Sequence, residues 1–291
     1  MKDKLKAYLM LLPAGFFFLV FVLIPLFYTF YLSFFDWNMI KAHKKFVGLQ
    51  NYLDLVQSPI FKTVLVNTFI YILLLLILNF VAPYILAYVL SIVVKKHKNF
   101  YRAAFFLPSL ISLVIGSVLY TWILNPVSGP LAIILRHFGL ALPIWSKTQG
   151  LVLVVISIIT SWKAFGYNFI VILGGLSGID ESIIEAARLD GANSLQLFRD
   201  IALPASSATG LYIFIMTIVQ GLQFVFTPIK VITQGGPSYA SSSLIYHAYH
   251  EAFILYRTGL SSALSILTML IFVFLLILEF KFVERGIYYE N

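Results

Sequence analysis

The chain has 291 residues, of which 60% are hydrophobic and only 11% are charged, and its mean hydropathy is +0.94. A soluble domain of this size lacks a core large enough to hide that much apolar surface, so a lipid bilayer is expected to surround most of the chain. The formal net charge of +8 comes without a nucleic-acid-binding motif, and the lack of cysteine excludes disulfides, thiolate metal sites and a cysteine nucleophile.

Six apolar segments are long enough to cross about 30 Å of hydrocarbon as helices. They cover approximately residues 8–35, 63–94, 104–124, 151–173, 205–226 and 258–280. The sequence therefore predicts an all-α integral membrane protein with six transmembrane helices. The first segment is too long for a signal core and lacks a small-x-small cleavage site, so an uncleaved helix is expected. Pro25, Pro83 and Pro108 lie within or at the edge of segments, where they predict kinks.

The distribution of lysine and arginine among the connections predicts the orientation. More of these residues fall in the cytoplasmic connections if the N-terminus is inside, and Lys95, Lys96 and Lys98 form a dense cluster in a short connection. Both termini and the connection after the fourth segment are therefore predicted to face the cytoplasm. The predicted division is residues 1–35 with the first transmembrane helix, an external loop over 36–62, and a core of five helices over 63–291.

The connection between the fourth and fifth segments, residues 178–204, is polar and predicts two short helices. The first helix begins either at Ser182, which has the spacing of a capping box to Glu185, or at Asp180 if that residue caps instead. Gly191 suits the left-handed position that ends such a helix.

The second short helix is expected to begin at Asn193, which has Gln196 three residues further on. It is expected to run to Pro204. By itself, a pair of capped helices at a membrane surface does not indicate a function, because packing of the helices alone can explain it.

Polar side chains within the apolar segments form a second group of candidates. Lys163 lies inside the fourth segment, where a lysine costs about 2.5–3.5 kcal/mol, so it is expected to face a cavity or a partner. Tyr167 shares its helix face. The predicted substrate pathway is polar and partly cationic, with the candidates Asn79, Trp162, Lys163, Tyr167, Asn168, Gln220 and Gln223. The alternative is that these groups make hydrogen bonds between helices and hold the bundle together.

A third candidate is His247-Ala248-Tyr249-His250-Glu251, which places two imidazoles three residues apart with a carboxylate beside them. A zinc site needs three or four protein ligands, and no further convincing ligand lies close in the sequence. A solvated external turn or helix is the favoured interpretation, and no metal site is predicted.

Motifs for ATP binding and hydrolysis are missing from the sequence. It contains no Walker-type phosphate loop, no Gly-x-Ser-x-Gly and no His-Glu-x-x-His. The chain is therefore not expected to be an enzyme, and if ATP drives it, another chain must bind the nucleotide.

The order of residues in the 178–204 connection is more specific than its helix pair. It runs Glu185-Ala186-Ala187, three residues, Gly191, nine residues, Ile201, one residue, Leu203-Pro204. This order resembles the cytoplasmic coupling motif of permease subunits from bacterial binding-protein-dependent ABC importers. Phe46-Val47-Gly48-Leu49-Gln50-Asn51-Tyr52 and Gly235-Gly236-Pro237 are similar to external loops of the carbohydrate-type branch, which includes maltose and glycerol-3-phosphate permeases. Within it, Trp162-Lys163 and Tyr167-Asn168 most resemble the first permease subunit of glycerol-3-phosphate importers.

The resemblance implies a type I ABC importer permease fold and a set of roles. Residues that would couple to the ATPase are Glu185, Ala186, Ala187, Asp190, Gly191, Ile201, Leu203 and Pro204. Residues that would face the binding protein are Gly235, Gly236 and Pro237. The branch usually has a proline where this chain has Asp180, which can cap the helix instead.

The resemblance also implies partners and a location. The partners would be a second homologous permease, an ATP-binding cassette ATPase dimer that uses ATP and Mg, an extracytoplasmic solute-binding protein and membrane lipid, but no nucleic acid. This chain would bind no cofactor, and it would lie in the bacterial cytoplasmic (inner) membrane. The implied solute is of the carbohydrate class, leaning to sn-glycerol-3-phosphate or a related phosphodiester. The alternatives are a sugar or oligosaccharide permease of the same fold and an ion-gradient-driven secondary transporter.

Overall fold

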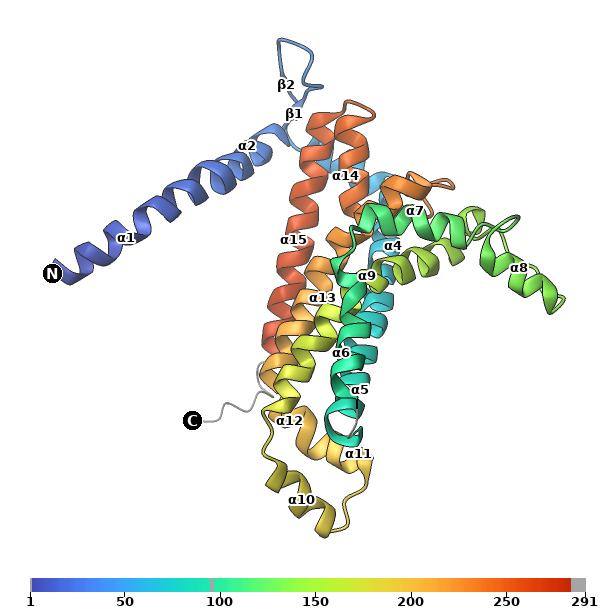
Figure 1. Ribbon diagram of the computed structural model, residues 1–291. Coiled ribbons are helices and arrows are strands. Elements are labelled where there is room, and N and C mark those ends of the chain that lie inside the picture. The colour runs from blue at the N-terminus through green and yellow to red at the C-terminus, as the bar shows by residue number, and fades with distance from the viewer. Residues whose placement is uncertain (1, 95–96, 284–291) are drawn as a thin grey trace. The chain divides into compact units, whose positions relative to one another are not determined.

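The computed structural model describes residues 2–94 and 97–283, and these are mainly helical (Figure 1). Lys95 and Lys96, used above for the orientation, and residues 284–291 of the predicted core lie outside the described residues. The helices are α1 (Lys2–Phe18), α2 (Ile24–Leu32), α3 (Gln50–Gln57), α4 (Pro59–Leu76), α5 (Ala82–Tyr88), α6 (Lys98–Phe106), α7 (Leu113–Ile123), α8 (Pro130–His137), α9 (Leu151–Ser177), α10 (Glu181–Leu189), α11 (Ser194–Gln196), α12 (Leu203–Ala205), α13 (Ser207–Pro228), α14 (Leu244–Phe253) and α15 (Thr258–Val283).

Short irregular turns join several of these helices into longer rods. The π-helical turns are η1 (Leu19–Leu23), η2 (Ile77–Val81), η3 (Val89–Val93), η6 (Leu197–Ala202) and η7 (Ile229–Thr233), and the 3-10 turns are η4 (Leu107–Leu110) and η5 (Trp145–Lys147). η1 ends two residues before Pro25, and η2 ends two residues before Pro83. Proline has no backbone N–H, so it cannot donate a hydrogen bond to the preceding turn. The missing hydrogen bond accounts for the widened turn at each of these prolines.

Five described helices are long and apolar enough to cross a membrane: Leu9–Leu32, Pro59–Val93, Leu151–Ser177, Ser207–Thr233 and Thr258–Leu278. A sixth crossing is possible only as a pair, Lys98–Leu110 and Leu113–Ile123, which meet at an angle of 98°. The all-α membrane fold is thus confirmed, but a continuous third helix over residues 104–124 is wrong. Pro108 lies in η4, and the extended backbone of Ile111 and Ser112 follows, so the helix breaks instead of kinking.

The described residues fall into two compact units. The first unit combines the residues up to 62 with 247–271, and the second combines 63–246 with those from 272 onward. In the first unit, β1 (Phe35–Asp36) and β2 (Lys45–Phe46) pair antiparallel, with Phe35 opposite Phe46. The Asn51 side chain donates to the carbonyls of Ser33 (2.8 Å) and Phe35 (3.0 Å), which fixes the start of this hairpin against α3.

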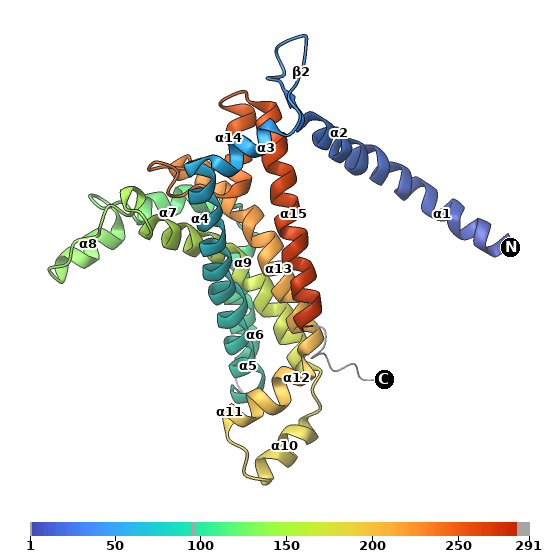
Figure 2. The same ribbon diagram turned by 180° about the vertical axis from the view of Figure 1, so that it is seen from behind.

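The core of the second unit lies between α5, α9 and α13, which run side by side in both views (Figures 1 and 2). Its buried residues are Tyr84, Ala87, Tyr88, Leu90, Phe169, Ile172, Leu173, Leu176, Ala202 and Ile213. Gly166 of α9 lets α6 approach closely: a Cβ there would lie 2.7 Å from Ser109 Oγ and 2.9 Å from Phe106 Cα. Both views also show α10 and α11 beyond one end of these helices.

Candidate functional site

The connection between α9 and α13, residues 178–204, forms two capped helices and is named here the α9–α13 loop. Asp180 caps α10, because its Oδ1 accepts the backbone N–H of Ser182 at 2.9 Å. This backbone hydrogen bond lowers the pKa of the Asp180 carboxyl, so the cap stays ionised at neutral pH. The alternative start at Ser182 is therefore wrong. Gly191 has φ +83°, which confirms its predicted left-handed conformation.

The second helix of this loop starts with a reciprocal cap. Asn193 Oδ1 accepts the N–H groups of Leu195 and Gln196 at 3.0 Å each, and Gln196 Oε1 accepts the N–H of Asn193 at 2.8 Å. The predicted Asn193 cap is confirmed. The helical run passes through η6 and continues one residue beyond Pro204 to Ala205.

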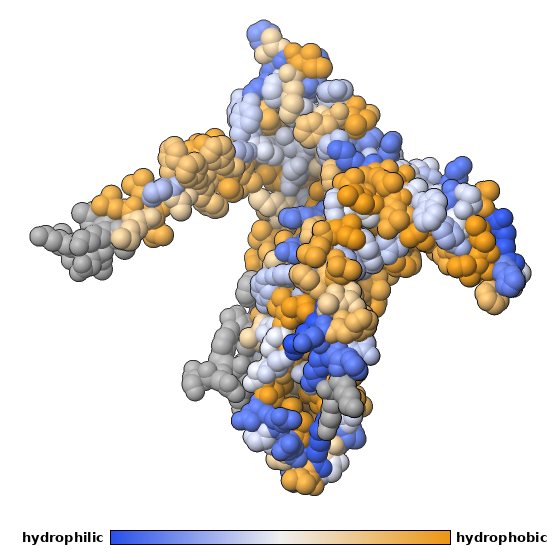
Figure 3. Space-filling view, viewed as in Figure 1, coloured by the Kyte–Doolittle hydropathy of each residue, from blue (hydrophilic) through white to orange (hydrophobic). Residues whose placement is uncertain are grey.

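The predicted coupling residues lie on an open face of this loop. Exposed side chains among them are those of Glu185, Ala186, Asp190, Leu203 and Pro204, and Gly191 is exposed as well; Ala187 and Ile201 are half-buried. Large apolar side chains stand beside them: Leu189 is 89% exposed, Leu195 72% and Ile183 49%. Figure 3 shows hydrophilic and apolar residues together at this end of the second unit. Exposed apolar groups amid charges are typical of a surface that binds another protein.

The same loop is tied to the helices behind it. The hydroxyl of Tyr88 donates to the Ser194 carbonyl at 2.6 Å, and the Phe198 ring lies 4.9 Å from the Tyr88 ring. Tyr84 shares a hydrogen bond with Ser206, and Ala202 is fully buried in the core. The α9–α13 loop is therefore joined by hydrogen bonds and ring contacts to α5, which belongs to the span Pro59–Val93.

A cavity of about 440 Å³ lies between α10 and the ends of the neighbouring helices. Its lining includes Lys98, Glu181, Glu185 and Arg188. Arg188 Nη2 donates to the Ile92 carbonyl at 3.2 Å, which holds α10 beside η3. Glu185 thus faces a space with groups of both charges.

Lys163 sits at the break between η4 and α7. Its Nζ donates to the carbonyls of Ser109 and Ile111, each at 2.8 Å, and Ser109 Oγ donates to the Lys163 carbonyl at 2.9 Å. The lysine therefore satisfies carbonyl groups that the broken helix leaves without N–H partners. This contact matches the alternative interpretation of hydrogen bonds between helices. The role of Ser109 was missed because nothing in its own sequence context marks it.

A cavity of about 370 Å³ opens beside this break. Three of the predicted pathway residues, Lys163, Tyr167 and Gln220, line it together with Phe106, Ser109, Ala164 and Phe224. Gln223 is exposed and lies outside this lining. Trp162 packs elsewhere, edge-on to Tyr120 with ring centroids 5.5 Å apart.

Asn168 and Asn79 belong to a buried polar contact between helices. Asn168 Nδ2 donates to the Asn79 carbonyl at 2.6 Å and to Thr217 Oγ1 at 3.1 Å. Asn79 lies in the π-helical turn η2 and is 1% exposed. The hydrogen bonds of Asn168 cross-link three helices, as the structural alternative expects, and Thr217 is a member that the sequence pattern did not reveal. Asn79 contributes only its backbone carbonyl, because its buried side chain has no hydrogen-bond partner among the described residues, so the alternative fits Asn168 but not the Asn79 side chain.

Gly235, Gly236 and Pro237 form a tightly bonded turn. Gly235 has φ +82°, and a Cβ there would lie 2.9 Å from the Tyr246 ring. Ser241 Oγ donates to the Gly236 carbonyl at 2.6 Å, and the following residues are bound to α4 through Asn67 and Tyr71. The turn is therefore a preformed feature of the second unit.

The His247–Glu251 stretch is a helix, but it is not solvated as the sequence suggested. His247 is 3% exposed and Glu251 is 2% exposed, so that part of the interpretation is wrong. Arg257 compensates the buried charge of Glu251, because its Nε and Nη2 donate to the two carboxylate oxygens at 2.7 and 2.8 Å. Burial lowers the pKa of His247 to about 4, helped by the charges of His250 and Arg257.

Comparisons with known proteins agree with this fold. Residues 97–287 match the family described as "Binding-protein-dependent transport system inner membrane component". The "Probable ABC transporter permease protein YurN" of Bacillus subtilis (strain 168) is 32% identical over 98% of both chains. The "sn-glycerol-3-phosphate transport system permease protein UgpA" of Brucella abortus biovar 1 (strain 9-941) is 30% identical over 99% of this chain and 98% of the relative.

A solved structure shares the fold over nearly the whole length. A chain of a bacterial ABC transporter "involved in the import of the acidic polysaccharide alginate" aligns with a TM-score of 0.84 and 23% identity, covering 98% of this chain and 96% of that one. The sequence relatives are permeases, so this chain is the membrane component of a transport system and not an enzyme. The chain belongs to the family of inner membrane components of binding-protein-dependent transport systems, with the type I ABC importer permease fold.

Proposed function

We propose that this chain is the transmembrane permease subunit of an ATP-driven importer for a carbohydrate-class solute. ATP and Mg are used by a separate ATPase, because the sequence has no phosphate-binding loop of its own. The observation that carries the proposal is the α9–α13 loop, which presents an exposed mixed face while it is bonded to the helices behind it. A docking element needs both properties, since it must bind a partner and transmit its movement.

The α10 helix supplies the docking contacts in this mechanism. Glu185 and Asp190 make polar contacts in a groove of the ATPase, Leu189 fills an apolar part of it, and Ala186 permits close approach. When the ATPase pair closes on ATP, the docked helices of two permeases move together. The packing of Phe198 against Tyr88 transmits this movement to the transmembrane helices, which then alternate between inward- and outward-facing states.

The partners follow from this arrangement. A second, homologous permease completes the translocation path, an ATP-binding cassette dimer docks on the two α9–α13 loops, and an extracytoplasmic binding protein contacts the turn at Gly235, Gly236 and Pro237. The assembly lies in the bacterial inner membrane, with both termini of this chain in the cytoplasm. The family description, which names binding proteins and the inner membrane, supports the binding-protein partner and the membrane location.

The solute we favour is sn-glycerol-3-phosphate or a related phosphodiester. The relatives named for this solute support it at about 30% identity. Lys163 has three N–H donors, of which two are bound to carbonyl groups, so one remains for an anionic oxygen in the adjoining cavity. Tyr167 and Gln220 supply further hydrogen-bonding groups there. A neutral sugar is the second candidate. The two carbonyl groups already stabilise much of the positive charge of Lys163, so the cavity does not require an anionic solute.

Cysteine labelling tests the docking role, because the natural chain has no cysteine. Ala186→Cys should cross-link to a subunit that is labelled by a photoreactive ATP analogue. Ser128→Cys is the matched control and should not cross-link to that subunit. It is exposed in the connection between the third and fourth apolar segments, which is expected to be external because the N-terminus and the 178–204 connection are predicted to be cytoplasmic. A membrane-impermeant maleimide should modify Ala186→Cys in inside-out vesicles and Ser128→Cys in right-side-out vesicles. Cross-linking at Ser128 alone would refute the assignment of the loop.

ATPase stimulation tests the solute. In proteoliposomes with the complete importer, a binding protein loaded with sn-glycerol-3-phosphate should raise the ATPase rate and drive uptake. Maltose and a glycerophosphodiester form the comparison set. Stimulation by maltose alone would replace the favoured solute with the sugar alternative, whereas uptake that persists without ATP hydrolysis would refute the ATP-driven mechanism itself.

A further inference from the structure

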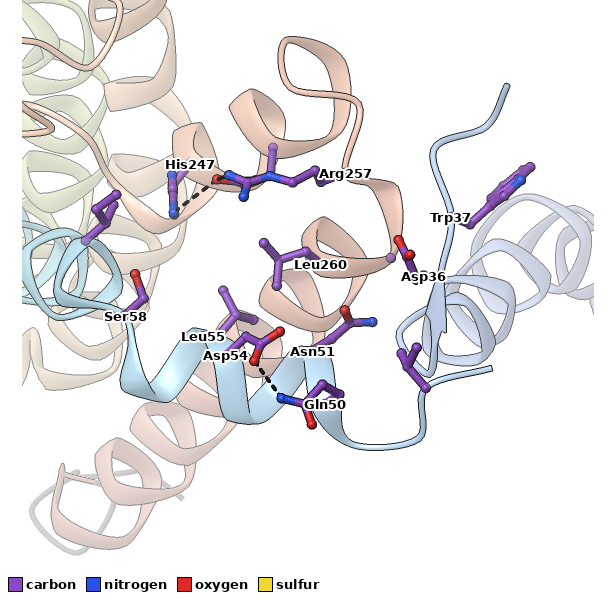
Figure 4. A pocket seen from close by; sticks show the side chains of 14 residues that line it. Asp36, Trp37, Gln50, Asn51, Asp54, Leu55, Ser58, His247, Arg257 and Leu260 are labelled. Atoms are coloured by element: carbon purple, nitrogen blue, oxygen red, sulfur yellow. Dashed lines mark hydrogen bonds and ion pairs between the residues drawn. The ribbon is translucent and has the colours of Figure 1, made fainter. Parts of the chain in front are cut away.

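A cavity of about 430 Å³ lies within the first unit (Figure 4). Its lining includes three carboxylates, those of Asp36, Asp54 and Glu251, against one guanidinium, that of Arg257. His247 also lines it. The formal charge of the lining is therefore negative, which favours a cation. Its lining shares no residue with the α9–α13 loop or with the cavity beside Lys163, and the transport mechanism above assigns it no role.

Helix α14 carries three potential metal ligands, two of which, His247 and Glu251, line this cavity. His247, His250 and Glu251 stand at positions i, i+3 and i+4, so their side chains share one helix face. One ligand atom from each lies within 4.8 Å of the other two. His247 Nε2 is 3.7 Å from Glu251 Oε1. Ligands of a tetrahedral zinc ion stand about 3.3 Å apart when the bonds are about 2.0–2.1 Å, so small side-chain rotations complete the set.

Arg257 orients the carboxylate of this group. Its Nε and Nη2 lie 2.7 and 2.8 Å from the two oxygens of Glu251. Each carboxylate oxygen keeps a further lone pair for another partner. Metal-ligating carboxylates are commonly held by such outer hydrogen bonds, which set their orientation.

We propose that His247, His250 and Glu251 form a binding site for a divalent transition-metal ion of the zinc class, with one coordination position open toward the cavity. Two imidazoles and one carboxylate form a donor set that zinc accepts, and three-ligand zinc sites keep the fourth position for water or another ligand. The cavity provides the entry path, because His247 and Glu251 both line it. The proposal does not depend on which solute the importer carries.

Cobalt(II) titration of the full-length chain, purified in detergent through a tag without histidine, tests this site. Cobalt in a site with few ligands absorbs visible light much more strongly than cobalt in water, and the absence of cysteine removes thiolate bands. We expect saturation at one cobalt per chain and loss of the absorption when zinc is added. His247→Ala and His250→Ala should each weaken binding at least about 100-fold, since each removes one of only three protein ligands.

The chain provides its own control, since it has five histidines and only two of them belong to this site. A triple variant, His43→Ala with His97→Ala and His137→Ala, should bind cobalt as the natural chain does. Failure of the natural chain to saturate at one cobalt would overturn the proposal. This measurement needs no substitution, so its outcome does not depend on whether a variant folds. Binding that survives His247→Ala but disappears in the triple variant would overturn it as well.

Discussion

Replacing Gly166 by alanine tests the close packing of α6 on α9, which positions Lys163 at the broken span. A Cβ at residue 166 would lie 2.7 Å from Ser109 Oγ and 2.9 Å from Phe106 Cα. Carbon atoms in contact ordinarily stand about 3.5–4.0 Å apart, so α6 must move outward by roughly 0.6–1.1 Å. Overpacking of this kind costs about 1–3 kcal/mol. The movement would also lengthen the hydrogen bonds between Lys163 and the break.

Gly174→Ala is the matched control, because Gly174 lies in the same helix and a Cβ there would meet nothing within 4 Å. Both variants gain the same helix propensity, about 1 kcal/mol, so it cancels in their difference. We expect Gly166→Ala to be less stable than Gly174→Ala by about 1–3 kcal/mol.

The assay is thermal unfolding of both purified variants in the same detergent, together with uptake in proteoliposomes. Gly166→Ala should unfold at a lower temperature than its control and transport more slowly at the same expression level. Equal unfolding temperatures and equal uptake for the two variants would show that α6 does not pack on Gly166 as described.

Further substitutions test the other parts of the site. Lys163→Met leaves two carbonyls at the break without the lysine and should cost about 1–3 kcal/mol, the usual cost of buried polar groups left unsatisfied, with Lys163→Arg losing less. Thermal unfolding measures this, and equal stability of all three proteins would contradict the contact. Gly191→Val forces a β-branched residue to φ +83° at a strain of about 1–2 kcal/mol, and should separate ATP hydrolysis from uptake in proteoliposomes; unaffected uptake would refute that turn. Leu189→Asp changes a side chain that is 89% exposed, so stability should persist while co-purification of the ATPase is lost; retained co-purification would remove Leu189 from the docking face. Asn193→Ala should cost about 1 kcal/mol and speed hydrogen exchange at Leu195 and Gln196, whereas Asn193→Asp should not.

The sequence by itself determined the features that depend on neighbouring residues. The apolar segments predicted the membrane fold because each must satisfy its backbone within a helix about 20 residues long. The cap at Asn193 and the left-handed turn at Gly191 are formed by atoms only a few residues apart, so their residue types were sufficient evidence. Asp180 required a choice between two caps, since Ser182 offers the same chemistry two residues later, and the structure decided it.

Only the tertiary structure decided the contacts between distant residues. Lys163 was recognisable as a costly charge, but its partners lie 54 and 52 residues earlier in the chain and exist only because the third span breaks. Likewise, the burial of His247 and Glu251 depends on the fold around them, with Arg257 as the ionic partner of Glu251. The physical reason is that periodicity shows which residues prefer lipid or water, whereas a hydrogen bond or a close contact depends on how one helix is placed against another.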